Sequence, residues 1–316
     1  MRLLHALQCT LAIGALASVA CGRVPVPPAA PNVIPAAFVV RMQRIQRPGD
    51  RGMVSIAVRT RRTTLTEEGD QIARREEESQ DVELEAAEKV LRVDSTGEPL
   101  ELEYTVEHLS VQTPAGRTEV LARGRVVIAE RGREKVTFRS GEALSPEAER
   151  ALGQILSPRS GTASDDDLLG TGTPQTIGAI WPVNAAVAAR ELGDASFPVP
   201  VEGVRGQTRL AGLAQVAGQT CLEITGELDA RSPGIAGAPP GSREVRMTYR
   251  RLLPVDTAAP ELDSALTVDM AVTVLQAVGT DREARTTTTA HQERRRQFTP
   301  GNRAPPEHHP RRGGWT

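Results

Sequence analysis

Aromatic side chains are scarce in this chain of 316 residues: four Phe, two Tyr and two Trp together make up 3% of it. Large rings therefore cannot dominate the core, which has to be built from Val, Leu, Ile and Ala. The net charge is also small, at −2, and this near balance does not favour a dedicated nucleic-acid binder. We expect no specific nucleic-acid partner.

The sequence patterns of common catalytic sites are missing as well. The chain has no G-x-S-x-G, H-E-x-x-H, C-x-x-C or S-x-x-K pattern, and the Gly170-Thr171-Gly172 turn lacks the Lys of a phosphate-binding loop. Between residues 6 and 290, His108 is the only histidine. A hydrolase that uses carboxylates alone would leave no such pattern. We predict a non-catalytic protein with no cofactor and no metal site.

The N-terminus has the pattern of a secretory signal. A basic start is followed by an apolar run from Leu3 to Val19, which is too short and too soon followed by prolines for a membrane-spanning helix. We predict a signal peptide over residues 1–20. The small residues before Cys21 resemble a bacterial lipobox, although Ser18 stands where Leu is commonest. The resemblance implies cleavage before Cys21 and acylation of its thiol, as with palmitate.

Cysteine usage fits that interpretation. Cys9 would leave with the signal, and an acylated Cys21 would leave Cys221 without a partner. The alternative is a Cys21–Cys221 disulfide. Residues 21–36 would form the lipidated cysteine and a tether, because five prolines between Gly22 and Pro35 favour an extended polyproline conformation. A plain N-terminal arm on a secreted protein is the alternative.

Residues 37–290 alternate between apolar and polar side chains, which is typical of antiparallel strands. The clearest strand is 100–107, with apolar residues at even positions and polar residues at odd ones. Turn-forming clusters lie at 94–97, 113–116 and 130–133. No crossover helix fits between these turns, so the strands should form an antiparallel meander.

Two short helices interrupt the strands. One is predicted over 146–156, with Ser145 as its N-cap and a proline at its first position. The other is predicted over 184–192, with Asn184 as its N-cap and Gly193 as its stop.

The stretch Thr176–Val183 begins the second of two blocks of similar size, 37–160 and 176–290, for which a duplication is one interpretation. It contains Trp181 between a glycine and a proline, so we expect a turn and a buried ring. Trp181 is interpreted as a packing anchor between two half-sheets. The alternative is the wall of a ligand pocket.

Several charged or reactive residues have a structural interpretation and a functional one. Arg74–Glu78 is expected at a solvated strand edge rather than at a cation site. Asp165–Asp167 suggest calcium, but the EF-hand pattern is absent, so we expect a polar loop. His108 is expected to be half-buried, and Cys221 to be a packed residue rather than a nucleophile.

Residues 291–316 are predicted to be a disordered basic tail, because six arginines stand among prolines and glycines. Such an arm is either a solubilising tail or a contact for anionic envelope polymers or lipid headgroups. The arginines assigned to this contact are Arg294, Arg295, Arg296, Arg311 and Arg312.

A resemblance to a family of secreted bacterial envelope lipoproteins is carried by the segments VDSTGEPL, TIGAIWPV and AGLAQVAGQTCLEITGEL. In that family a Gly-x-x-Trp element follows a β block, although its usual Asp before the Trp is Ile180 here. The resemblance implies a β-rich body and brings no catalytic residues with it. More loosely, the chain is similar to the lipoprotein-carrier half-barrel, which binds acyl chains.

The sequence thus predicts a mainly β fold: a long curved antiparallel sheet, as a half-barrel or two half-sheets, with two short helices. We expect an exported protein, anchored by Cys21 on the periplasmic face of the outer membrane, or secreted if it is not acylated. Its sheet would bind an apolar ligand or lipid; the alternative is a structural or interaction lipoprotein with a filled core. The two differ in whether apolar residues such as the row from Leu266 to Val274 stay uncovered.

Overall fold

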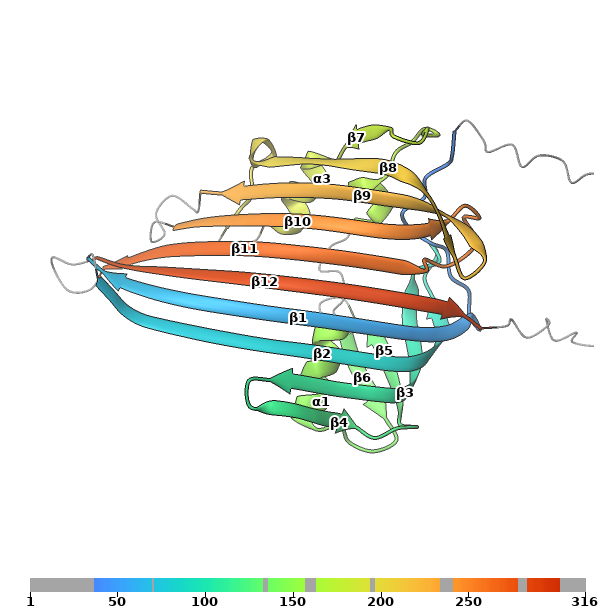
Figure 1. The fold of residues 1–316 in the computed structure, drawn as a ribbon, viewed down its shortest axis with the longest axis horizontal. Helices are drawn as coiled ribbons and strands as arrows, with labels where there is room; N and C mark the ends of the chain where they lie inside the picture. Colours follow the sequence, from blue (N-terminus) through green and yellow to red (C-terminus); the bar gives the residue numbers. More distant parts are fainter. Residues whose placement is uncertain are drawn as a thin grey trace, which may run out of the picture. The chain divides into compact units, whose positions relative to one another are not determined.

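The computed structural model describes residues 37–69, 71–132, 136–156, 163–193, 197–233, 241–277 and 283–301. Within these ranges the chain forms one open, twelve-stranded antiparallel sheet, with its helices on one side (Figure 1). The prediction of a mainly β fold built on a long antiparallel sheet is confirmed. No helix in the described ranges is both long and apolar enough to cross a bilayer.

The strands fall into two meanders. The first contains β1 (Arg51–Glu68), β2 (Gln71–Val93), β3 (Pro99–Thr113), β4 (Gly116–Leu121), β5 (Val126–Arg131) and β6 (Val136–Ser140). The second contains β7 (Ile180–Pro182), β8 (Val204–Val216), β9 (Gln219–Ser232), β10 (Gly241–Pro254), β11 (Asp263–Ala277) and β12 (Glu283–Pro300).

The first and last strands of the chain join the two meanders in the middle of the sheet. The strand order is β6-β5-β3-β2-β1-β12-β11-β10-β9-β8-β7, and β4 pairs with the far end of β3. β1 and β12 pair in register from Gly52↔Pro300 to Glu68↔Ala284. The two predicted half-sheets are therefore one continuous sheet, because each meander presents a long strand to the other.

The segment between β6 and β7 carries the helices α1 (Pro146–Ile155), α2 (Asp165–Leu169) and α3 (Ala185–Leu192). Both predicted helices are confirmed with their caps: Ser145 Oγ accepts from Ala148 N at 3.1 Å, and Asn184 Oδ1 accepts from Val187 N at 3.3 Å. α2 was not predicted. A short 3-10 turn, Val201–Gly203, precedes β8.

Two cores form on the helix side of the sheet, which we call its inner face. The first core packs α1, including Leu152, against the inner side chains of β1, β2 and β3, among them Ile56 and Leu84. The second core consists of two clusters, one around Trp181 and one around α3, and Leu169 of α2 packs against both. The buried residues alternate along each strand, because period two sends every second side chain to the inner face.

The predicted tail boundary at residue 290 is wrong, because β12 continues to Pro300. The arginines suggested a solvated arm, yet β1 and β11 supply hydrogen-bond partners on both sides of this strand. Arg295 faces Asp263 at 3.2 Å, and Arg296 faces Glu88 at 2.9 Å. Hydrogen-bond pairing along both edges of this central strand thus outweighs the disorder that the composition of the segment suggests.

The place predicted for Trp181 needs correction as well. Gly178 makes the predicted turn with a φ of 89°, and the ring is buried as expected. However, Trp181 lies in β7, an edge strand, while the two halves meet at β1 and β12. Its Nε1 donates to the carbonyl of Leu169 at 2.8 Å, so the ring anchors α2 to the sheet edge.

His108 lies on the opposite phase from the one that simple alternation assigns to it. A β-bulge between β2 and β3 skips one residue, so that Glu85 faces His108 and Ala86 faces Val106. Leu109 then turns to the buried face, and His108 turns to the outer face. It is half-buried, as expected, and its Nδ1 lies 3.1 Å from Glu119.

Candidate functional site

The inner side chains of β11 distinguish the middle of the sheet from its two cores. Alternation along this strand gives a straight apolar row, flanked by β10 on one side and β12 on the other. All five members are only partly covered, whereas the inner residues of β1 and β9 are buried. The row comprises Leu266, Val268, Met270, Val272 and Val274.

A groove of about 740 Å³, which we call the central groove, opens over the Leu266 end of this row, whereas Val268 and Met270 pack against the cluster around α3. Its floor comes from β10, β11 and β12, including Met247, Leu266 and Gln292. The first core provides one wall and the helices α2 and α3 provide the other. The apolar wall residues are Leu102, Tyr104 and Leu156 on one side, and Leu168, Leu169 and Leu192 on the other.

Charged side chains enter the groove as pairs. On the wall of the first core, Arg296 Nη2 lies 2.9 and 3.2 Å from the two carboxylate oxygens of Glu88. The Glu88 side chain is only 5% exposed, and the guanidinium of Arg296 lies 5.3 Å from the ring centre of Phe298. This pairing makes it possible for an acidic residue to lie among apolar neighbours.

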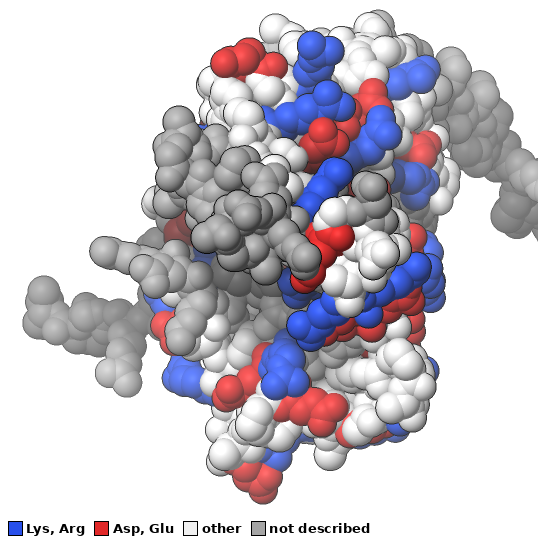
Figure 2. Space-filling model, turned by 90° about the vertical axis from the view of Figure 1, so that its left-hand side faces the viewer, with Lys and Arg blue, Asp and Glu red and all other residues white. Residues whose placement is uncertain are grey.

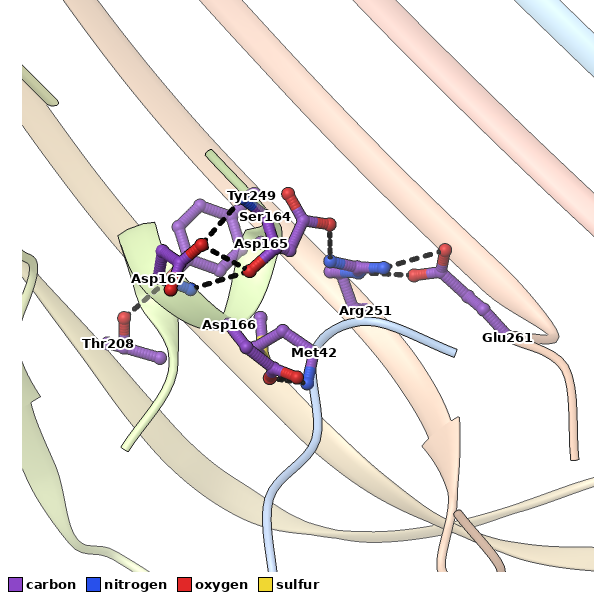
Figure 3. A network of polar contacts seen from close by, with 9 residues as sticks. All are labelled: Met42, Ser164, Asp165, Asp166, Asp167, Thr208, Tyr249, Arg251 and Glu261. Atoms are coloured by element: carbon purple, nitrogen blue, oxygen red, sulfur yellow. Dashed lines mark hydrogen bonds and ion pairs between the residues drawn. The ribbon is translucent and has the colours of Figure 1, made fainter. Parts of the chain in front are cut away.

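The opposite wall contains a second network, drawn in Figure 3. Arg251 of β10 donates through Nη1 to Asp165 at 2.6 Å and through Nη2 to Glu261 at 3.0 Å. All three side chains are largely buried. The Arg251 guanidinium therefore connects α2, the middle of the sheet and the loop after β10.

Burial and pairing raise the pKa values of two arginines and two tyrosines of the groove, so the arginines stay charged and the tyrosines stay neutral. Burial lowers the pKa of Arg251, but the carboxylates of Glu261 and Asp165 outweigh it and raise this pKa. For Arg296, burial is likewise outweighed by Glu88, so its pKa is raised. Burial raises the pKa of Tyr249 to about 12 and that of Tyr104 well above its ordinary value.

The three aspartates of α2 each contact a different protein group. Asp165 pairs with Arg251, Asp166 accepts from the backbone N of Met42 at 2.6 Å, and Asp167 forms a capping box with Ser164 (Figure 3). The polar loop predicted for this run is instead the start of a helix, which Ser164 and Asp167 define. In the described ranges, no group of three or more His, Cys, Asp or Glu residues is placed to hold a metal ion.

The outer face of the sheet has a different chemistry. The registers place Arg61, His291, Asp269, Arg246, Asp229 and Arg205 in one cross-strand row over six strands. His291 Nδ1 lies 2.6 Å from Asp269, and Arg246 Nε lies 3.2 Å from Asp229. Figure 2 views the molecule from the left-hand side of Figure 1, at the strand ends rather than onto this face, and shows basic and acidic side chains interspersed there as well. A shallow hollow of about 900 Å³ follows this row, and its balanced charge favours neither sign of ligand.

The remaining sequence predictions have mixed outcomes. Cys221 is a fully buried free thiol in β9, packed against Leu252 and Leu262, as expected of a structural residue. Arg74–Glu78 is exposed in the part of β2 that pairs with β1 but reaches beyond β3, so the predicted solvated edge is confirmed. Cys21, Arg311 and Arg312 lie outside the described residues.

The sequence predicts the apolar row but not the ion pairs beside it. Glu88 follows Leu84 and Ala86 on the buried phase of β2, and Arg296 precedes Phe298 on the buried phase of β12. The signal that the sequence offers for such a pair is a charged residue at a position where alternation predicts an apolar one. Only the register shows that these two charges face each other.

No protein-family model matches this sequence, and no curated protein matches it. Among solved structures, one of lipid–protein interactions in lipovitellin is similar over 82% of this chain, with 6% identity and a TM-score of 0.35. This chain spans only 26% of that lipovitellin chain. OpdQ of Pseudomonas aeruginosa is similar over 79% of this chain and 98% of its own, with 7% identity and a TM-score of 0.22. A LolA-superfamily protein of Nitrosomonas europaea is similar over 77% and 86%, with 10% identity and a TM-score of 0.09. All three TM-scores lie below 0.5, so these similarities carry no argument about function.

Proposed function

We propose that this protein is a non-catalytic lipoprotein of the bacterial cell envelope that holds an apolar ligand, such as a lipid, in the central groove. The partly exposed apolar lining of this groove is the observation that carries the proposal. Apolar surface left in water forfeits about 25 cal/mol for each Å² that a ligand would cover. The groove volume of about 740 Å³ lies inside the usual range of ligand pockets, roughly 300–1,000 Å³.

The lining of the groove suits an apolar ligand. Met247 and Leu266 lie on the floor, and leucines stand on both walls: Leu102 and Leu156 on one side, Leu168, Leu169 and Leu192 on the other. These side chains are only partly buried, so a bound apolar ligand would cover them.

The charged groups of the groove support binding rather than catalysis. Glu88 and Arg296 neutralise each other, and Arg251 is held by two carboxylates. A general acid or base needs a pKa near the working pH. The raised pKa values of Tyr104, Tyr249 and Arg251 move these groups away from neutral pH.

The test of the groove combines ligand detection with a variant that fills it. Native mass spectrometry of the purified protein should detect a co-purifying lipid. Leu266→Trp should reduce its occupancy severalfold, because the indole fills the floor. The matched control, Thr267→Trp, puts the same ring on the outer face of the same strand. Protein that is free of lipid and does not take up added fatty acid would contradict the proposal and favour a structural or interaction role.

The envelope assignment rests on the predicted signal peptide and on Cys21. Cys21→Ser should move the protein from the membrane fraction to the soluble fraction, because a single acyl chain contributes about 0.8 kcal/mol of transfer free energy per CH₂. Labelling with a palmitate analogue should disappear in the same variant. Unchanged membrane fractionation together with unchanged labelling would overturn the assignment.

A further inference from the structure

Residues 37–47 form an extended segment, the strap, that crosses one end of the molecule. Phe38 exchanges two backbone hydrogen bonds of 2.8 Å with Gln175, and the N–H of Gln46 donates to Gly97 at 2.9 Å. In between, Arg44 donates to the carbonyls of Pro254 and Asp256 at 3.0 and 3.1 Å. The strap is thus tied to both halves of the sheet.

Side chains of the strap alternate between buried and exposed positions. Phe38, Val40, Met42 and Arg44 point inward and are at most 7% exposed. The side chains between them point outward, as expected for an extended backbone. The two large apolar residues among these are Val39 and Ile45, which are 54% and 59% exposed.

More exposed apolar residues lie beside the strap. Ile177 follows Gln175, the backbone partner of Phe38, and Ile180 opens the adjacent edge strand β7. Val255 lies between the two residues whose carbonyls hold Arg44. Five of the nine exposed large apolar side chains in the described ranges therefore belong to one region, which we call the rim: Val39, Ile45, Ile177, Ile180 and Val255.

Three exposed arginines lie among these apolar residues. Arg41 lies between Val39 and Ile45 on the outward side of the strap, is 62% exposed, and has its Nη1 4.0 Å from Asp166. Arg47 at the end of the strap is exposed, and so is Arg209, which pairs with Ile180 in the register of β7 and β8. The carboxylates of Asp50 and Asp256 are capped by backbone N–H groups.

We infer that the rim docks on an anionic lipid bilayer, with its apolar side chains in the interface and Arg41, Arg47 and Arg209 at the headgroups. Apolar residues interspersed with arginines are the chemistry of interfacial binding. The described chain begins at the rim, and residues 22–36 extend at most roughly 54 Å from Cys21, at about 3.6 Å per residue. A lipid-anchored chain would therefore keep this end within reach of its membrane, whether or not the groove holds a ligand.

The test measures co-sedimentation of the full chain carrying Cys21→Ser, so that no acyl anchor contributes, with protein-free vesicles of phosphatidylcholine with or without phosphatidylglycerol. The pair Val39→Asp and Ile45→Asp should weaken binding to the anionic vesicles about tenfold and leave the melting temperature unchanged. The matched control is Ile72→Asp with Val126→Asp, because those residues are 62% and 42% exposed but lie away from the strap. This pair should bind as the parent does.

Two further variants separate competing sources of binding. Removing residues 302–316 takes away three arginines outside the described chain and should leave most of the binding in place. Leu266→Trp, which fills the groove, should also bind as the parent does, so that failure of the groove and failure of the rim are distinguishable. Equal weakening by the rim pair and the control pair would overturn the inference, as would a parent that binds no vesicles.

Discussion

The two faces of β10 use the same side chain in opposite ways. On the inner face Arg251 is 12% exposed and lies between two carboxylates of similar burial. On the outer face Arg246 is 63% exposed and pairs with Asp229, which is 45% exposed. Removing charges from water is costly, so the inner network persists only because its geometry is complete. The outer pair keeps its water and contributes little stability.

The same contrast separates the apolar residues of the sheet. Inner residues of β1 and β9 are buried in the two cores, while the inner row of β11 is only partly covered: Val268 and Met270 pack against the cluster around α3, and Leu266 lines the central groove. Identical alternation thus yields a core in one strand and a candidate ligand floor in another. The two strands differ in which elements pack over them, not in their own residue pattern.

Removing the inner arginine should have the largest effect. Arg251→Leu leaves Asp165 and Glu261 buried without their partner and should lower the free energy of unfolding by about 3–5 kcal/mol. Arg246→Leu on the outer face should cost at most about 1 kcal/mol. Guanidinium denaturation of both variants measures the difference. Equal losses would remove the distinction between the faces.

The next effect concerns Gly226 on the inner face of β9. The ring of Tyr249 lies across this glycine, and an added Cβ would lie within 2.5 Å of three of its atoms. Gly226→Ala should therefore lower the free energy of unfolding by about 1–3 kcal/mol through overpacking. Gly212→Ala in β8 is the control, because its added Cβ meets nothing within 4 Å. Thermal melting of the two variants compares them, and a stable Gly226→Ala protein would place the ring elsewhere.

The two buried tyrosines should make the stability of the fold depend on pH. Both are on the inner face, and burial raises the pKa of Tyr249 to about 12 and the pKa of Tyr104 further above its ordinary range. The folded state then holds protons that the unfolded state loses, so stability should fall as pH rises above about 10. Phenolate absorbance should stay low at pH 10–11 in the folded protein and appear in guanidinium. A normal titration of the folded protein would mean that these rings are exposed.

The smallest effect should come from His291 on the outer face. Hydrogen bonds with Asp269 and Glu293 raise its pKa above the ordinary value. The protonated His291 contributes fully to the free energy of unfolding below about pH 6.5, and this contribution is lost as pH rises through the pKa of the folded state. Solvent screening keeps this contribution small. Imidazole NMR titration should show the raised pKa, and Asp269→Asn should lower it; an unchanged pKa in that variant would remove Asp269 as its cause.

Local pattern was enough for most of the individual elements. Alternation over 100–107 predicted β3, and Ser145 and Asn184 predicted the starts of α1 and α3. These signals depend on residues within a few positions of each other, so they survive without a tertiary context. Positions 291–300 failed because the partners that hold them, Glu88 and Asp263, are remote in sequence.

The sequence by itself determined the class of the protein: an aliphatic, aromatic-poor chain whose alternation favours antiparallel sheet and whose N-terminus has a signal-like pattern. Only the tertiary structure decided that β1 and β12 join the halves, that Glu88 meets Arg296, and that the row on β11 is only partly covered. The physical reason is that burial and pairing depend on which distant segment arrives opposite a residue. The inner face of β11 has the same pattern as a core strand, and what covers it comes from elsewhere in the chain.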